Sequence, residues 1–211
     1  MKKILSVFLV GFIALSSFAQ QKQTDSITAD GQKLIQFLDG TNVESLWARG
    51  WHVNWETGVS TTPSRNSHST HCSAFAASVA KQMGFYLLRP PEHGQNLLAN
   101  AQFDWLQTDE AAKNGWEKVA TGWDAQSLAN HGYLVLVVYK NNDEARPGHI
   151  AVVRPAVKTE MKITEEGTQV TQAGGHNYYS ISLKTGFGNH PDAWPNGVVF
   201  YKHSVDWQAI K

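Results

Sequence analysis

Cys72 is the only cysteine in this chain of 211 residues, and a cysteine thiolate is a strong nucleophile. Apolar residues recur every three or four positions from Cys72 to Met83 within the stretch HSTHCSAFAASVAKQMG. This period predicts a helix over these residues, with Ser69 or Thr70 as its cap and Gly84 as its stop. The sequence therefore places the thiol in the first turn of an amphipathic helix.

Two interpretations of Cys72 remain open at this point. A thiol in the first helical turn lies at the positive end of the helix dipole, which lowers its pKa and favours the thiolate. A free cysteine is also among the most buried residue types and can be a small apolar residue at the start of a core face.

The first residues of the chain predict export, which favours a functional thiol. Lys2 and Lys3 precede an apolar run, and small residues follow before Gln20, so residues 1–19 are typical of a cleaved signal peptide. No cysteine stands directly after the run, so we expect a periplasmic or secreted protein rather than a lipoprotein. Cysteines in such oxidising surroundings are usually paired, so an unpaired one is a candidate reactive thiol.

A nucleophilic cysteine requires a base, and the segment GHIAVV offers His149. Strand alternation puts His149 on the face opposite to Ile150 and Arg154, and Arg154 indicates that its own face meets solvent. His149 is therefore expected to point inward. A core histidine with both ring nitrogens satisfied is the structural alternative.

Gln172 is the first candidate for orienting His149, because its amide oxygen could accept a hydrogen from one ring nitrogen and leave the other free for the thiol. Asn177 is the second candidate, since it is in phase with inward residues of its own predicted strand. The alternative for either amide is that it closes a local turn around AGGHN.

The order of the predicted elements indicates an α+β fold, with helices first and an antiparallel sheet afterwards. We expect residues 20–28 to be a flexible lead-in, residues 61–70 to be a loop, and residues 29–211 to form one domain; whether 47–55 is helical stays open. The predicted helices span 31–38, 72–83, 95–106 and 125–130, and the predicted strands span 133–140, 149–155, 168–174, 177–183 and 197–203.

Charge and hydropathy exclude several classes of protein. The full chain has 18 basic and 18 acidic residues, and loss of Lys2 and Lys3 would leave 16 against 18, a net charge of −2. The sequence shows no basic face that would indicate nucleic acid as a partner. No apolar run after the first one is long enough to span a membrane. We expect a monomer without a cofactor.

The ordered set of motifs resembles the NlpC-type and CHAP-type cysteine peptidases and amidases, a papain-like group that cuts bacterial cell-wall peptides. HCSAF at a helix start, GYLVLVVYK, then GHIAVV on a strand and a polar residue on the next strand carry the likeness, over about residues 66–183. His71 stands where the family usually has Asp, Ala74 where it has Gly, and Tyr133 where it has Asp. The chain is thus similar to a divergent member.

The resemblance implies a papain-like core in which a nucleophile-bearing helix packs on the sheet. It implies that Cys72 attacks an amide carbonyl, His149 is the base, Gln172 orients His149, and the Cys72 backbone amide helps to hold the oxyanion. The implied substrate is a stem peptide of peptidoglycan, cleaved through a thioester. His71 and Trp55 are further candidates for orienting groups or substrate contacts.

Three alternatives remain. His68, His71 and Cys72 could ligate zinc, although no usual metal-binding spacing supports this and we predict no metal site. The same fold could be an inactive binding module with a Trp-lined cleft, for which WHVNWETG would be the hallmark. An acyl or amino-group transferase could use the same scaffold.

Overall fold

The computed structural model describes residues 22–210, which form the expected α+β fold. The signal peptide predicted at 1–19 lies outside the described residues. The helices are α1 (Ala29–Gly40), α2 (Cys72–Gln82), α3 (Leu98–Trp105), α4 (Asp109–Lys113), α5 (Gly122–Asn130), α6 (Glu160–Glu166) and α7 (Leu183–Gly186). The strands are β1 (Trp51–Val53), β2 (Ser60–Pro63), β3 (Glu117–Val119), β4 (Leu134–Tyr139), β5 (His149–Val153), β6 (Gln169–Gln172), β7 (Tyr178–Ser182) and β8 (Val199–His203).

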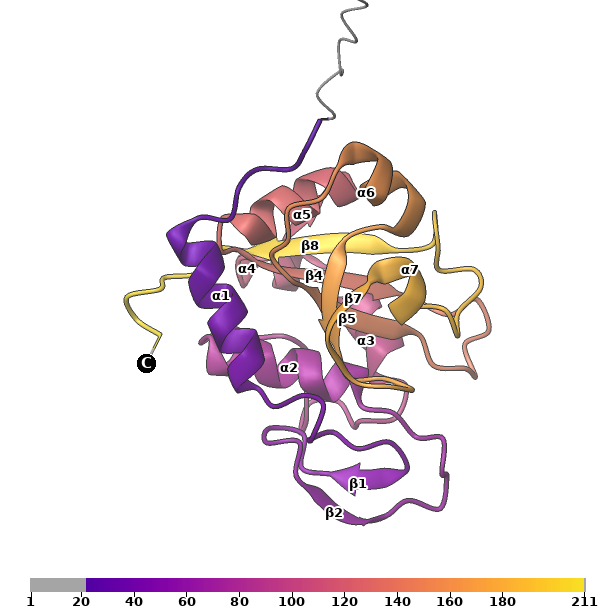
Figure 1. Ribbon diagram of the computed structural model, residues 1–211. Helices are drawn as coiled ribbons and strands as arrows, with labels where there is room; N and C mark the ends of the chain where they lie inside the picture. The colour runs from indigo at the N-terminus through magenta and orange to yellow at the C-terminus, as the bar shows by residue number, and fades with distance from the viewer. Residues whose placement is uncertain (1–21, 211) are drawn as a thin grey trace, which may run out of the picture.

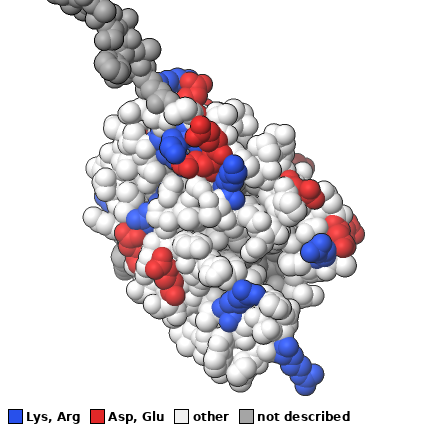
Figure 2. Space-filling view, turned by 45° about the vertical axis from the view of Figure 1, so that its right-hand side comes forward, with Lys and Arg blue, Asp and Glu red and all other residues white. Residues whose placement is uncertain are grey.

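Six strands form the main sheet in the order β3-β8-β4-β5-β6-β7, and every neighbouring pair is antiparallel. In Figure 1, α5 and α6 lie above the sheet and α2 lies below it, while the β1–β2 hairpin extends beyond α2. Among the described residues, no helix is long and apolar enough to cross a bilayer. Basic and acidic side chains are intermixed on the face seen in Figure 2, without an extended patch of one sign.

The five longer strands and the longer helices coincide with the predicted ones to within a few residues. The sequence analysis missed the short elements β1 to β3, α4, α6 and α7, and residues 61–63 of the predicted loop belong to β2. These elements have three to seven residues, which is too short for a hydrophobic period to show. The segment from Trp51 to Val53 is a strand and not a helix.

Helix α2 begins at Cys72 as predicted, but its cap differs from the prediction. The N-cap residue is His71, whose side chain makes no capping hydrogen bond, so neither Ser69 nor Thr70 has that role. Burial explains how the helix is stable without such a cap, because Cys72 to Ala80 are all buried. Tertiary packing of this kind contributes more to a helix than its local end signals.

Helices and loops cover both faces of the central strands. All residues of β4 and β5 are buried, including Ile150 and Val152. The expectation that Arg154 marks a solvent face is therefore wrong. The Arg154 guanidinium instead forms an ion pair with Asp39 of α1, with Nη1 and Oδ1 2.8 Å apart, because α1 ends over this part of the sheet.

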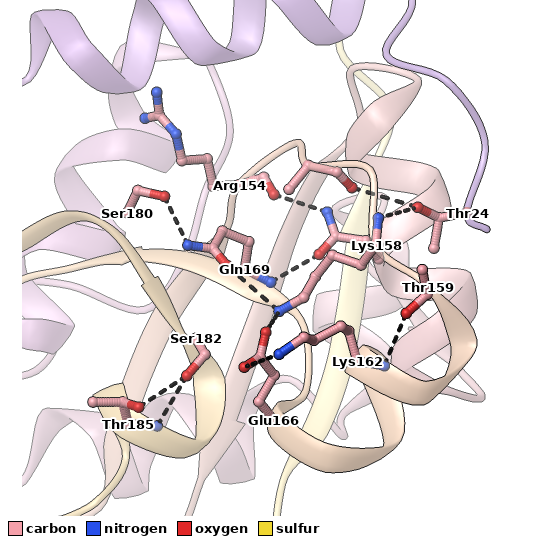
Figure 3. Close-up of polar contacts among 12 residues, drawn as sticks. Thr24, Arg154, Lys158, Thr159, Lys162, Glu166, Gln169, Ser180, Ser182 and Thr185 are labelled. Atoms are coloured by element: carbon pink, nitrogen blue, oxygen red, sulfur yellow. Dashed lines mark hydrogen bonds and ion pairs between the residues drawn. The ribbon is translucent and has the colours of Figure 1, made fainter. Parts of the chain in front are cut away.

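The predicted flexible lead-in is held to the domain from residue 23 onward. Gln23 forms an isolated antiparallel bridge with Thr159. The buried Thr24 donates its backbone N–H to Lys158 O at 2.9 Å and accepts from Lys158 N at 3.0 Å. These contacts continue into an ion pair between Lys158 Nζ and Glu166 Oε1 at 3.0 Å (Figure 3). Backbone pairing, which composition does not reveal, thus orders this polar segment.

We predict that Glu166→Gln destabilises the protein by about 1 to 3 kcal/mol, because it leaves the nearly buried ammonium of Lys158 without its counter-charge. The hydrogen bond from Lys158 lowers the pKa of Glu166. The ion pair should therefore make its full contribution to the free energy of unfolding above the pKa of glutamate in the unfolded chain. This contribution should disappear as the pH falls through the lower pKa of Glu166 in the folded protein. Urea unfolding at pH 7 and pH 3 measures both effects.

Glu165→Gln is the matched control, since Glu165 is exposed on the same helix. Equal stability of the two variants at pH 7 would show that the Lys158–Glu166 ion pair contributes nothing.

Candidate active site

The thiol of Cys72 is buried and unpaired, and backbone amides surround it. The side chain is 5% exposed. The backbone amides of Cys72, Ser73 and Ile150 favour the thiolate, and those of Cys72 and Ser73 have no helical partners in the first turn. Three N–H groups therefore converge where a thiolate or an oxyanion would form.

The sheet explains why the Ile150 amide is available. Arg154 donates its backbone N–H to Gln169 O at 2.8 Å, and the antiparallel ladder points every second amide of β5 towards the same neighbour, so Ile150 also points towards β6. Strand β6 ends at Gln172, before a residue opposite Ile150. The Ile150 amide is therefore not used by the ladder and favours the thiolate of Cys72 instead.

Burial raises the pKa of the Cys72 thiol, and this effect is larger than the opposing effect of the three amides. The sequence analysis predicted a lowered pKa from the helix dipole alone. That prediction is wrong because removal of a thiolate from water costs more than the helix start returns. The resting site therefore holds a neutral thiol.

His149 and Gln172 form a buried pair across β5 and β6. His149 Nε2 lies 2.9 Å from Gln172 Oε1. The Gln172 amide nitrogen donates to the carbonyls of His176 and Gly186, each at 3.3 Å, which directs Oε1 to the ring. His149 Nε2 therefore carries the hydrogen, and Nδ1 is left as the acceptor.

Close backbone approach fixes both members of this pair. A Cβ on Gly186 would lie 2.6 Å from Gln172 Oε1, and one on Gly148 would lie 2.1 Å from Tyr139 O. Only glycine fits at position 148, where the close atom is backbone, whereas a side chain at position 186 would displace the Gln172 amide. Burial lowers the pKa of His149 to about 4, against the opposing effect of its hydrogen bond to Gln172, so the ring is neutral at pH 7.

Cys72 and His149 lie on two elements that pack together, helix α2 and strand β5. Helix α2 packs against β5, and the thiol adjoins the amide of Ile150, the residue directly after His149. The hydrogen bonds found within residues 22–210 include none between the Cys72 thiol and the His149 ring, although the sequence analysis expected one. Such contacts are often long in an unliganded enzyme and shorten when substrate binds.

Asn177 closes the local turn around AGGHN, which is the alternative that the sequence analysis gave for it. Its amide donates to Val43 O at 2.8 Å and to Leu46 O at 2.7 Å, and its Oδ1 accepts from Gly174 N at 2.9 Å. Asn177 therefore fastens the segment after α1 to the turn before β7, and Gln172 is the residue that contacts His149.

The remaining candidates differ in their positions. His71 is buried, and its Nε2 lies 2.8 Å from Trp51 O; burial lowers the pKa of His71. Trp55 lies away from the thiol, with its ring under Lys81 and Arg89 at 5.3 and 5.7 Å.

A pocket opens in front of Cys72. Trp51, 41% exposed, lies at this pocket together with His71. The lining of this pocket consists of Trp51 to Val53, Ser64, Asn66, His68 to Ser73, Gln95 to Ala99, Ala145, Pro147 and Gly148. The absence of acidic and lysine or arginine side chains from this lining favours an uncharged polar ligand such as a peptide or a glycan.

The zinc alternative lacks support. His68 Nδ1 contacts the Arg49 guanidinium and His71 Nε2 contacts a carbonyl oxygen, so these nitrogens face groups other than a metal. Within the part of the chain that the structure describes, no cluster of three or more His, Cys, Asp or Glu side chains is arranged to hold a metal ion.

The sequence analysis did not identify two residues that contact the ring of His149. The Phe187 ring meets the His149 ring edge-on at 4.5 Å, and the His190 ring stacks on it at 5.4 Å. Both follow α7, an element too short to be predicted. Comparison with known proteins adds no further assignment, since no protein-family model matches the chain and a search of curated proteins finds no significant match.

We predict that alkylation of Cys72 by iodoacetamide has its half-maximal rate at a higher pH in the native protein than in urea-denatured protein, because burial raises the thiol pKa. The midpoint of the pH profile is the measurement, since burial also slows the reaction at every pH. His149→Ala should leave the midpoint unchanged, because the neutral ring of His149 contributes no charge. A native midpoint below the denatured one would instead indicate a thiolate–imidazolium pair at rest.

We also predict that Asn177→Ala lowers the free energy of unfolding by about 1 to 3 kcal/mol through its lost buried hydrogen bonds. The alkylation midpoint of Cys72 should not change. Asn142→Ala, at an exposed position, is the control for both measurements. A shifted alkylation midpoint of Cys72 with an unchanged free energy of unfolding would show that Asn177 belongs to the site.

Proposed function

We propose that the protein is a cysteine hydrolase that cleaves an amide bond through Cys72, His149 and Gln172. One observation carries the proposal: a buried histidine whose tautomer a glutamine sets lies on β5, the strand against which the helix that begins at Cys72 packs. A satisfied core histidine would not need a free Nδ1 beside the only cysteine of the chain.

The reaction begins from neutral groups. Nδ1 of His149 takes the thiol proton as the sulfur attacks the carbonyl carbon, and the negative charge moves to the carbonyl oxygen. The converging amides stabilise that oxyanion. The imidazolium then gives its proton to the leaving amine, the C–N bond breaks, and a thioester remains on Cys72.

The second half restores the thiol. Water loses a proton to His149 and attacks the thioester carbonyl, the C–S bond breaks, and the sulfur recovers its proton from the ring. The raised pKa of Cys72 and the lowered pKa of His149 make an ion pair unfavourable at rest. Proton transfer is therefore coupled to attack, when the forming oxyanion offsets the cost.

The substrate of this proposal is a stem peptide of peptidoglycan. The neutral pocket with Trp51 at its edge suits a peptide that carries few charges at the scissile bond. The choice of the cell-wall polymer rests on the resemblance to the NlpC-type and CHAP-type enzymes and on the predicted signal peptide.

We predict that the mature protein releases new amines or carboxylates from purified peptidoglycan and that Cys72→Ala abolishes the release. Gln172→Ala should lower kcat by roughly 10- to 100-fold, because His149 retains its place but loses its tautomer control. Gln169→Ala is the matched control on β6, since its amide bonds Ser180 instead. Mass spectrometry of the fragments identifies the bond.

Two results would overturn the proposal. Full activity of Cys72→Ala would exclude the nucleophile. Tight binding to peptidoglycan without cleavage by wild type would favour the binding module, in which case Trp51→Ala should weaken binding more than Trp55→Ala. Formation of a new amide when a free amine is added would identify a transferase.

A further inference from the structure

The ring of His190 stacks on the ring of His149, which Gln172 also contacts at Nε2 and Phe187 contacts in a T-shaped arrangement. The two imidazole rings are nearly parallel, with an interplanar angle of 18° and centroids 5.4 Å apart. The Tyr139 ring lies on another side of His190, tilted at 51° with centroids 5.4 Å apart. His149 is thus held by a hydrogen bond at Nε2, by an aromatic edge and by a second imidazole.

The loop after α7 places His190 through its backbone. His190 donates its N–H to Phe187 O at 2.8 Å, and His190 O accepts from Ala193 N at 2.9 Å. The turn therefore presents Phe187 and His190, three positions apart, to the same ring. No hydrogen bond from the His190 side chain occurs among the described residues, so stacking is the contact its ring makes with His149.

We propose that His190 is a positioning residue that covers the ring of His149, keeps water from it and holds its free nitrogen towards Cys72. The proposal rests on the proposed function, because the orientation of that nitrogen matters only if His149 is the base. Removal of the covering ring would leave His149 free to rotate about its side-chain bonds and exposed to water.

The charges around His190 fit this role. His149 faces it from β5, Tyr139 faces it from β4, and Arg146 lies in the loop before β5. Burial, together with the smaller effects of His149 and Arg146, lowers the pKa of His190 to about 4. His190 therefore presents an uncharged ring at neutral pH and does not repel the imidazolium that forms on His149 during the reaction.

The test compares His190→Phe, which keeps a flat ring without a charge, with His190→Ala, which removes the ring. Nitrogen-15 NMR of the His149 ring at pH 7 reports its tautomer without any need for activity. Wild type and His190→Phe should show one tautomer, hydrogenated at Nε2, whereas His190→Ala should show both. His203→Ala is the matched control, since His203 stacks on Phe85 at 3.7 Å away from His149.

A pH titration gives a second readout. Water reaching His149 lowers the cost of charging the ring, so its pKa should rise from about 4 towards an ordinary histidine value in His190→Ala and stay low in His190→Phe. An unchanged tautomer and pKa in His190→Ala would overturn the proposal. Equal changes in His190→Phe and His190→Ala would also overturn it, because they would show that stacking is not the cause.

Kinetics separates this proposal from the proposed function. With peptidoglycan as substrate, His190→Ala should lower kcat by about tenfold with little change in KM. The acid limb of its pH–activity profile should move to higher pH. If wild type cleaves nothing while the NMR changes occur, the proposed function fails and the effect of His190 on the ring stands. If wild type cleaves and His190→Ala has wild-type kcat and pH profile, the positioning role fails alone.

Discussion

The buried hydrogen bond between His149 and Gln172 is the interaction on which the arrangement of the site depends. A buried imidazole has two polar nitrogens, and each must find a partner or cost free energy. Gln172 satisfies one nitrogen, and its own amide hydrogens are taken by two backbone carbonyls. The direction of the bond is therefore determined, which leaves Nδ1 as the basic nitrogen of the ring.

Burial also governs the electrostatics of the site. It raises the pKa of Cys72 and lowers that of His149, so the same physical cause favours the uncharged form of both groups. The helix start and the Ile150 amide act in the opposite direction on the thiol, but more weakly. A site of this kind holds its charge-stabilising groups in place before any charge exists, which is the arrangement that transition-state stabilisation requires.

The fold leaves backbone N–H groups unpaired at two places, the end of β6 and the start of α2. Strand β6 ends at Gln172, before the residue that would pair with Ile150, so the Ile150 amide is left to favour the thiolate of Cys72. Helix α2 begins at Cys72 without a side-chain cap, which leaves its first amides free. A longer strand or a capped helix would be more regular and would remove the N–H groups that converge on the sulfur.

The residues themselves determined the α+β class, because a 3.6-residue period marks α2 and short apolar runs rich in valine mark β4 and β5. They also indicated Cys72, His149 and Gln172, since a lone thiol and polar residues on apolar strand faces are visible in one dimension. The choice between Gln172 and Asn177 was not visible, because both are in phase with inward positions and only the sheet register decides which one meets the ring.

Tertiary structure alone decided the pKa directions and the surroundings of His149. The predicted low pKa of Cys72 followed from a local feature, the helix start, whereas the observed shift comes from desolvation by segments far away in the sequence. His190 follows a four-residue helix without a period of its own, so nothing along the chain places it against His149. Local patterns encode elements and faces, but burial and ring contacts are properties of the assembled fold.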